Sequence, residues 1–314
     1  METVKKEVTN VLNVGQRITE NDFKFLADNY KKYYEHGNAS FVIEKELIQE
    51  NLTFNENVAG IRFMYGLKDP LNPNSLVLFL IPCSSISEKG ISTESMLKKE
   101  GYHDHVGNLY SLQEVALMLS QYVKSVAAEN PNLVYKEITR GNFYGKNSLE
   151  SLLVNDCTFI QFNFGVKNNS ISPVIQPLNK NFYQLNEVFM DFSRPCPTYC
   201  NELGEEGCVA TLAVASNSDG EIELNEFRYF RDYHLLELAG GAQLFELYYI
   251  ISPVVAKIMQ RDANNIVSLG QFYKEEITPF KLLLKEGNHQ EAVYALKETL
   301  EVLLEEYDHA KVFV

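Results

Sequence analysis

The sequence has few basic residues and no long apolar run, and each absence excludes a class of function. Its 314 residues include 28 Lys and Arg against 42 Asp and Glu, a net charge of −14 at neutral pH. Nucleic-acid and anionic membrane surfaces attract clustered Lys and Arg, so this balance argues against both as partners. The longest apolar runs, at residues 75–82 and 244–256, are shorter than the roughly 18 residues needed for a membrane span.

The sequence also predicts neither a secretory signal nor a disulfide framework. No apolar core follows Lys5 and Lys6, as a secretory signal would require. The five cysteines are an odd number and are widely spaced, which suits a reducing compartment. We therefore expect a cytoplasmic protein.

Motifs of the common enzyme classes are missing as well. The chain contains no Gly-x-Ser-x-Gly, no Walker loop, no His-Glu-x-x-His and no paired zinc knuckle. Gly240 and Gly241 lie between helical segments and not after a strand, so they do not predict a phosphate loop. These absences favour a protein without catalytic activity and leave the enzyme question open.

What the first 200 residues do contain is a repeated pattern. Residues 57–68 align without gaps on residues 156–167, with an Ile, a Phe, an aromatic-Gly step and a closing Lys in register. Apolar residues alternate with less apolar ones in both stretches, which predicts half-buried strands. Each stretch continues through a polar turn into a second apolar run, so the sequence predicts one hairpin over residues 57–81 and another over 156–175.

Helical patterns precede each predicted hairpin. Thr19 and Asp22 can cap a first helix, and Ser111 and Glu114 form a capping-box pattern for a second one. Shorter helical segments are predicted at residues 41–50 and 148–154. Helix, helix and hairpin, twice over, indicate an α+β fold whose two copies pack as a pseudo-symmetric pair.

The last third of the chain has a helical pattern throughout. A cap pattern at Asn288 and Glu291 opens a long final helix, and apolar residues keep helical spacing upstream of it. We expect three domains: α+β repeats at residues 1–100 and 101–203, and an all-α domain at residues 204–314.

The helical third carries a family-like pattern over about residues 207–262. Cys-Val-Ala-Thr at 208–211, Phe-Arg-Tyr-Phe-Arg-Asp at 227–232 and Tyr-Tyr-x-x-Ser-Pro at 248–253 resemble the bacterial C-terminal domain called the CFI box. Val209 departs from the family, which has Phe-Ile there. The resemblance implies a bacterial protein with a helical module; the family has no established activity, so it implies no reaction.

The duplicated part is similar to small uncharacterised bacterial proteins. The matching elements are Phe-Tyr-Gly-Lys-Asn at residues 143–147, the strand at residues 160–166, and Pro-Cys-Pro-Thr-Tyr-Cys at residues 195–200. This resemblance also implies no known chemistry.

Cys196, Cys200 and Cys208 are the sharpest chemical cluster, with three thiols within 13 residues. Thiolates suit zinc or an iron–sulfur cluster, but such sites usually add a fourth ligand and a Cys-x2-Cys knuckle, and neither is visible. A redox or disulfide pair and a packed core thiol at Cys208 are the alternatives. We expect no resident cofactor.

Two further groups have polar side chains at suggestive spacing. His103 and His105 would share one face of an extended strand and could bind a divalent metal, although surface-loop polarity explains them equally well. Arg228, Arg231 and Asp232 lie within one helical turn; they predict a structural polar network in the helical domain, with an anion site as the alternative.

Together these features favour a non-enzymatic protein–protein interaction or structural module. The chain has 18 Tyr and 19 Phe, and tyrosine is well suited to protein contacts. We expect a protein partner or self-association. The alternatives are a metal-binding or thiol-redox protein built on the three cysteines, and a small-molecule site between the two copies.

Overall fold

The chain folds into two compact units, and both helices and antiparallel sheets are present, as the predicted α+β class requires. One unit comprises Met1–Ser111 and Gln121–Glu202, and the other Leu112–Ser120 and Leu203–Val314. The computed structural model describes residues 10–33, 40–85, 93–129, 138–153, 156–167, 170–185, 189–191, 194–196, 226–227, 229–231, 233–261 and 271–310.

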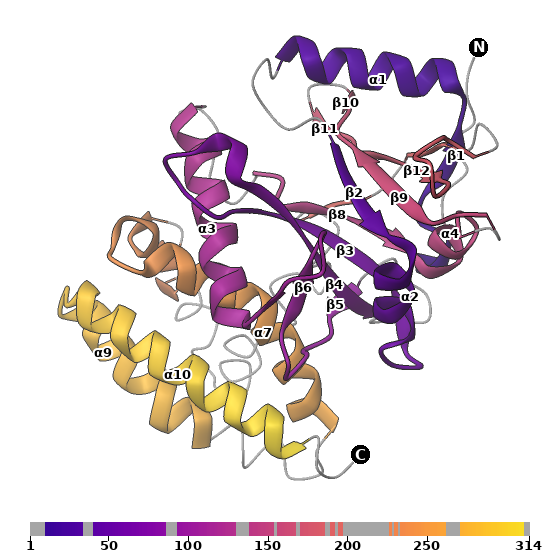
Figure 1. Ribbon diagram of the computed structural model, residues 1–314. Helices are drawn as coiled ribbons and strands as arrows, with labels where there is room; N and C mark the ends of the chain where they lie inside the picture. The colour runs from indigo at the N-terminus through magenta and orange to yellow at the C-terminus, as the bar shows by residue number, and fades with distance from the viewer. Residues whose placement is uncertain are drawn as a thin grey trace. The chain divides into compact units, whose positions relative to one another are not determined.

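The first unit contains two larger antiparallel sheets and a short two-stranded one (Figure 1). The five-stranded sheet has the order β1-β13-β12-β9-β2, and the seven-stranded sheet has the order β14-β8-β3-β4-β6-β7, with β5 paired to β4. The strands are β1 (Gln16–Ile18), β2 (Ser40–Glu44), β3 (Val58–Leu67), β4 (Leu76–Ser85), β5 (Thr93–Ser95), β6 (Tyr102–Asp104), β7 (Leu109–Tyr110), β8 (Gly141–Gly145), β9 (Phe159–Asn163), β10 (Val166–Lys167), β11 (Ser170–Ile171), β12 (Val174–Leu178), β13 (Phe189–Asp191) and β14 (Arg194–Cys196).

Helical segments connect these strands. Thr19 and Asp22 cap α1 reciprocally, since each side chain accepts a hydrogen bond from the backbone N–H of the other, and α3 begins directly after Ser111, as its cap pattern predicts. The segments are the 3-10 turns η1 (Val11–Asn13) and η2 (Pro73–Ser75), and the helices α1 (Glu20–Tyr33), α2 (Lys45–Thr53), α3 (Leu112–Glu129) and α4 (Lys146–Glu150).

The hairpin predicted over residues 57–81 is present as β3 and β4. Ile61 pairs with Pro82, and Phe63 pairs with Leu80. All ten residues of β3 are buried. Among them is Arg62, whose buried guanidinium is paired: it donates a hydrogen bond to Ser95 Oγ at 2.9 Å. In the region of the second predicted hairpin, β9 pairs with β12 and β10 pairs with β11.

The helix predicted over residues 41–50 is wrong at its start. Residues 40–44 form β2, and the helix α2 begins only at Lys45. Phe41 and Ile43 are buried where β2 pairs with β9, and the β-branched pair Val42-Ile43 favours a strand. The helix predicted at residues 148–154 is shifted in the other direction: α4 begins earlier, at Lys146 directly after β8, and ends at Glu150.

An aromatic cluster joins the two larger sheets. Phe162 of β9 lies 5.5 Å from Phe63 and 6.4 Å from Tyr65 between ring centroids, and both partners belong to β3. Phe164 continues the cluster, 5.2 Å from Tyr65. The Tyr65 hydroxyl donates to Asn142 Oδ1 in β8, so its polar end is paired inside the core.

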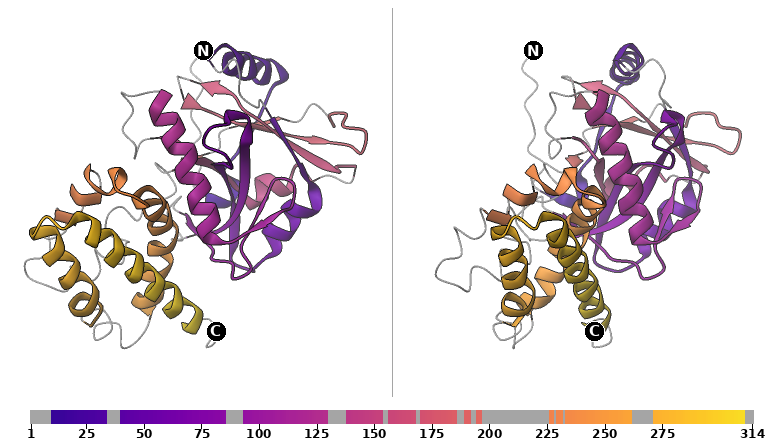
Figure 2. Two further views of the ribbon diagram at one scale, coloured as in Figure 1. Left: turned by 60° about the vertical axis from the view of Figure 1, so that its left-hand side comes forward. Right: turned by 90° about the vertical axis from the view of Figure 1, so that its left-hand side faces the viewer.

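The second unit is helical in its described part. It contains residues 112–120 of α3, η5 (Leu235–Glu237), α7 (Gly241–Arg261), the π-helix η6 (Tyr273–Ile277), α9 (Thr278–Lys285) and α10 (His289–Ala310). Figure 2 shows α9 and α10 side by side in both views, and Phe280 of α9 stacks on Phe227 at 5.2 Å. No helix in the described ranges is long and apolar enough to cross a membrane.

We predict that Phe162→Ala lowers the free energy of unfolding by about 3–5 kcal/mol, because it removes a fully buried ring from the contact between the sheets. Phe25→Ala is the matched control: this ring is 63% exposed on α1, and its loss should change stability by about 0.5 kcal/mol or less. Urea denaturation of both variants measures the difference, and equal losses would contradict the assignment of the core.

Candidate functional site

A cleft in the first unit is the candidate functional site among the described residues. Its volume is about 430 Å³, within the range of ligand-binding pockets. Four segments line it: β2, the start of α2, the loop after β6, and a pair of aromatic rings from β9 and the turn after β12. The lining residues are Val42, Glu44, Glu46, Leu47, Glu50, His105, Val106, Gly107, Phe159 and Phe182.

The strand period decides which side chains of β2 and β9 reach the cleft. Phe41 and Ile43 pair with Phe162 and Ile160, and all four are buried. Because successive strand residues point to opposite faces, the intervening residues of both strands face the other way. Three of them, Val42, Glu44 and Phe159, line the cleft.

A stacked aromatic pair forms one wall of the cleft. The rings of Phe159 and Phe182 lie 4.7 Å apart and within 12° of parallel, yet Phe182 is 59% exposed. Its φ of 61° is the left-handed conformation, which is unfavourable for a bulky residue. The turn enforces it: Asn179 Oδ1 accepts from the backbone N–H of Asn181 at 2.9 Å and of Tyr183 at 3.0 Å.

Three carboxylates form the acidic rim of the cleft. Glu44 is the N-cap residue of α2, and Glu46 and Glu50 share one helix face because they are four residues apart. Glu50 Oε1 lies 3.8 Å from Lys98 Nζ and 3.6 Å from His103 Nδ1. Within the described part of the chain, Glu44 and Glu46 have no salt-bridge partner within 4 Å, and the cleft lining contains three glutamates and no Lys or Arg, so the lining itself is acidic.

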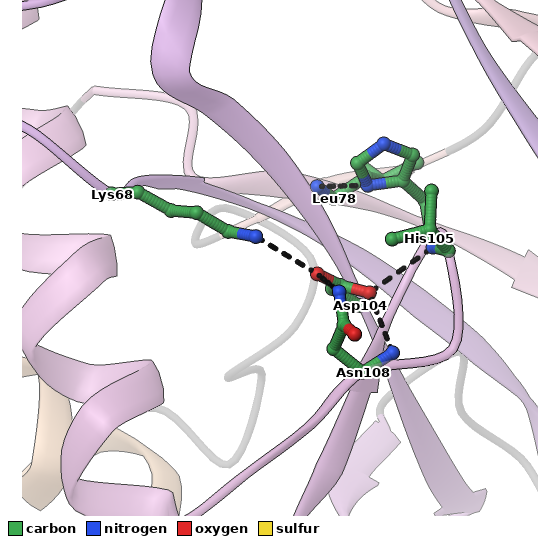
Figure 3. A network of polar contacts seen from close by, with 6 residues as sticks. Lys68, Leu78, Asp104, His105 and Asn108 are labelled. Atoms are coloured by element: carbon green, nitrogen blue, oxygen red, sulfur yellow. Dashed lines mark hydrogen bonds and ion pairs between the residues drawn. The ribbon is translucent and has the colours of Figure 1, made fainter.

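A buried aspartate holds the loop that closes the third side (Figure 3). The Asp104 side chain is fully buried. Its Oδ1 accepts from the backbone N–H of Val106 at 3.1 Å and of Asn108 at 2.9 Å, and its Oδ2 accepts from Asn108 Nδ2 at 3.1 Å and Lys68 Nζ at 3.2 Å. Burial alone would raise the pKa of this carboxyl, but these hydrogen bonds outweigh it and hold the pKa below its ordinary value.

His105 lies at the base of the same loop as a neutral, packed imidazole. Its Nδ1 accepts from the backbone N–H of Leu78 at 3.4 Å, and its ring meets Phe41 edge-on at 4.6 Å. Burial lowers the pKa of His105 below 6.5; the charge of Asp104 opposes this effect and that of Lys68 adds to it. The imidazole therefore contributes no positive charge to the cleft at neutral pH.

The two predicted histidine ligands have separate partners in the structure. His103 lies beside Glu50, whereas His105 accepts from Leu78. Asp104 between them anchors the loop. In the ranges that the structure describes, no group of three or more His, Cys, Asp or Glu side chains is arranged to hold a metal ion.

The other predicted site residues fall largely outside the described residues. Cys200, Cys208, Arg228 and Asp232 lie there, and Cys196 is described only as the last backbone position of β14. Arg231 is described, with its guanidinium 5.8 Å from the centre of the Tyr249 ring.

Two thiols elsewhere in the chain are buried. Cys83 and Cys157 are free cysteines, and burial raises the pKa of Cys157. A raised pKa disfavours the reactive thiolate at this position.

Sequence reasoning missed the cleft because its walls are distant in the chain. The closely spaced glutamates at residues 44, 46 and 50 were a usable signal for an acidic surface. Nothing in the sequence indicates that Phe182 adopts a left-handed conformation.

No protein-family model matches the chain, and comparison with curated proteins and with solved structures finds no significant match. The CFI-box resemblance therefore stays a prediction.

We predict that Asp104→Asn lowers the free energy of unfolding by about 2–3 kcal/mol. Hydrogen bonds to a buried charge are replaced by weaker ones to a neutral oxygen. In addition, the amide N–H₂ would face Lys68, and both groups are donors. Asp28→Asn is the control: Asp28 is exposed and pairs with Lys31 only at 3.9 Å, so the change should cost about 0.5 kcal/mol or less. Chemical denaturation at pH 7 compares the two; a loss in D104N no larger than in D28N would contradict the anchoring role.

The lowered pKa of His105 predicts a specific pH dependence of stability. The unfolded chain binds a proton at His105 more readily than the folded chain does. The neutral imidazole's contribution to the free energy of unfolding is therefore fully present above pH 6.5, and it is lost as the pH falls through the pKa of the folded state. In His105→Asn the side chain does not titrate, and its Oδ1 can replace Nδ1 as the acceptor. Between pH 7.5 and 5.5 the wild type should lose more unfolding free energy than H105N, as measured by urea denaturation; parallel pH profiles would contradict this assignment.

Proposed function

We propose that this protein is a non-enzymatic protein–protein interaction module that binds its partner through the cleft. The observation that carries the proposal is Phe182, a ring 59% exposed in a left-handed conformation that its turn enforces. Strained backbone is retained where function needs it, and aromatic anchors dominate binding at protein interfaces.

Further exposed aromatic side chains support an interaction role over a catalytic one. The described surface exposes several rings that could be buried by a partner. No described polar group near the cleft combines a nucleophile with an adjacent base, as catalysis would need. The exposed rings are Phe25, Phe54, Phe182, Tyr183, Tyr229, Tyr233 and Tyr294.

We further infer that residues 1–100 and 101–203 arose by duplication. In each half a five-residue strand leads directly into a helix, and the next strand follows that helix. The order is β2, α2, β3 in the first half and β8, α4, β9 in the second. The strands pair reciprocally, β2 with β9 and β8 with β3. Such an exchange is what two interlocked copies would produce, and it supports the repeat.

We predict that Phe182→Asn removes partner binding while the protein stays folded, because asparagine tolerates a positive φ and only the exposed ring is lost. Tyr183→Asn is the matched control: Tyr183 is 69% exposed, is the next residue, and does not line the cleft. Immobilised wild type, F182N and Y183N are compared by quantitative mass spectrometry of proteins retained from native lysate, with mass photometry for self-association.

The wild type and Y183N should retain the same partner, and F182N should retain at least about tenfold less of it. If the partner is a second copy, the dimer should be lost in F182N alone. A strictly monomeric wild type whose retained proteins match those of F182N would contradict the proposed function.

A further inference from the structure

We propose that the cleft binds an arginine-bearing segment of a basic partner protein, an inference that rests on the proposed function and names the chemistry of its partner. The cleft combines an apolar wall with an acidic rim. These two features call for a ligand group that is flat and apolar on its faces and positively charged at its edge, which the guanidinium of arginine provides.

The acidic rim supplies the charge complementarity. Glu44, Glu46 and Glu50 face one cleft. Among the described residues only Glu50 has a salt-bridge partner within 4 Å, Lys98, whose Nζ lies 3.8 Å from Glu50 Oε1; His103 Nδ1 lies 3.6 Å from the same oxygen. The remaining wall residue that could carry positive charge, His105, is neutral at physiological pH because its ring is buried. A cation entering the cleft therefore meets carboxylates and no competing charge from the lining.

The aromatic wall selects arginine over a simple ammonium group. Phe182 is stacked on Phe159 through one face and is 59% exposed. A planar guanidinium can stack on an exposed aromatic face and still direct its N–H groups sideways to carboxylates. Lysine carries a compact point charge and cannot do both with one group.

Apolar lining residues can contact the aliphatic part of such a segment. Leu47 is buried, Val42 is half-buried, and Val106 is 64% exposed on the loop that Asp104 anchors. A cleft of about 430 Å³ has room for an arginine together with part of its neighbours. The chain's net charge of −14 would also attract a basic partner over a longer range.

The test uses the full-length protein and two peptide libraries. Both consist of nonapeptides with randomised flanks; one has a fixed central arginine, and the other has citrulline, which has nearly the same shape without the charge. Each library is passed over immobilised wild type, F182N, the double variant Glu44→Gln with Glu46→Gln, and the control Glu56→Gln with Glu129→Gln. The control changes net charge by the same amount at exposed glutamates outside the cleft.

We expect the wild type and the E56Q/E129Q control to retain the arginine library about three- to tenfold better than the citrulline library. E44Q/E46Q should lose this preference, F182N should retain little of either library, and higher salt should weaken arginine retention. Thermal melts check that every variant is folded.

The outcomes separate the two proposals. Equal retention of both libraries by the wild type, with loss in F182N, overturns the arginine assignment and leaves the interaction role of the cleft intact. Equal retention by wild type and F182N, or no retention by the wild type, overturns the arginine assignment and counts against the cleft itself. An arginine preference that survives in E44Q/E46Q also overturns the assignment.

Discussion

The packing of β9 against β3 is the contact on which the rest of the first unit depends. Phe162 meets Phe63 and Tyr65 in the core, and this fixes which face of β9 points inward. Because β2 pairs with β9 in register, the same contact also fixes β2. The alternate residues of both strands, which include Glu44 and Phe159, therefore point to the face that carries the cleft. A shift of one residue would bury the glutamate and expose the core rings.

A buried charge supplies the second constraint. Taking Asp104 out of water is costly unless its oxygens are paired, and Val106, Asn108 and Lys68 provide the donors. The same bonds determine the path of residues 105–107, which form one side of the cleft. The cleft is thus shaped by two independent requirements, apolar packing on one side and satisfaction of a buried carboxylate on the other.

The fold was predictable where local signals and tertiary structure agree. The Thr19–Asp22 cap and the hairpin of β3 and β4 both follow from short-range patterns. The prediction failed at residues 40–44, because a five-residue strand runs directly into a helix with no turn residue between them, and the helical spacing of Glu46, Leu47 and Glu50 masks it. Only the pairing of β2 with a strand more than a hundred residues away decides the conformation.

The site was predictable only in part, for a related reason. The spacing of His103 and His105 suggested a pair of metal ligands, but their contacts, Glu50 and Leu78, come from other elements. The same is true of Lys68, which pairs with Asp104 between them. Which partners lie beside these side chains in the fold decides whether they bind a metal or anchor a loop, and the spacing in the sequence does not give this. The wall formed by Phe159 and Phe182 depends on the left-handed backbone conformation of Phe182, which is unusual for a phenylalanine and could not be expected from the sequence.

Photo-crosslinking in cells tests the central claim, that the cleft is a binding surface, most directly. A p-benzoylphenylalanine is placed at position 106, on the cleft loop, and in a second strain at position 25, an exposed site on α1. We predict that irradiation yields one discrete protein adduct from position 106 and none from position 25, with an arginine in or beside the crosslinked peptide of the partner. The same adducts from both positions, or none from position 106, would contradict a binding role for the cleft.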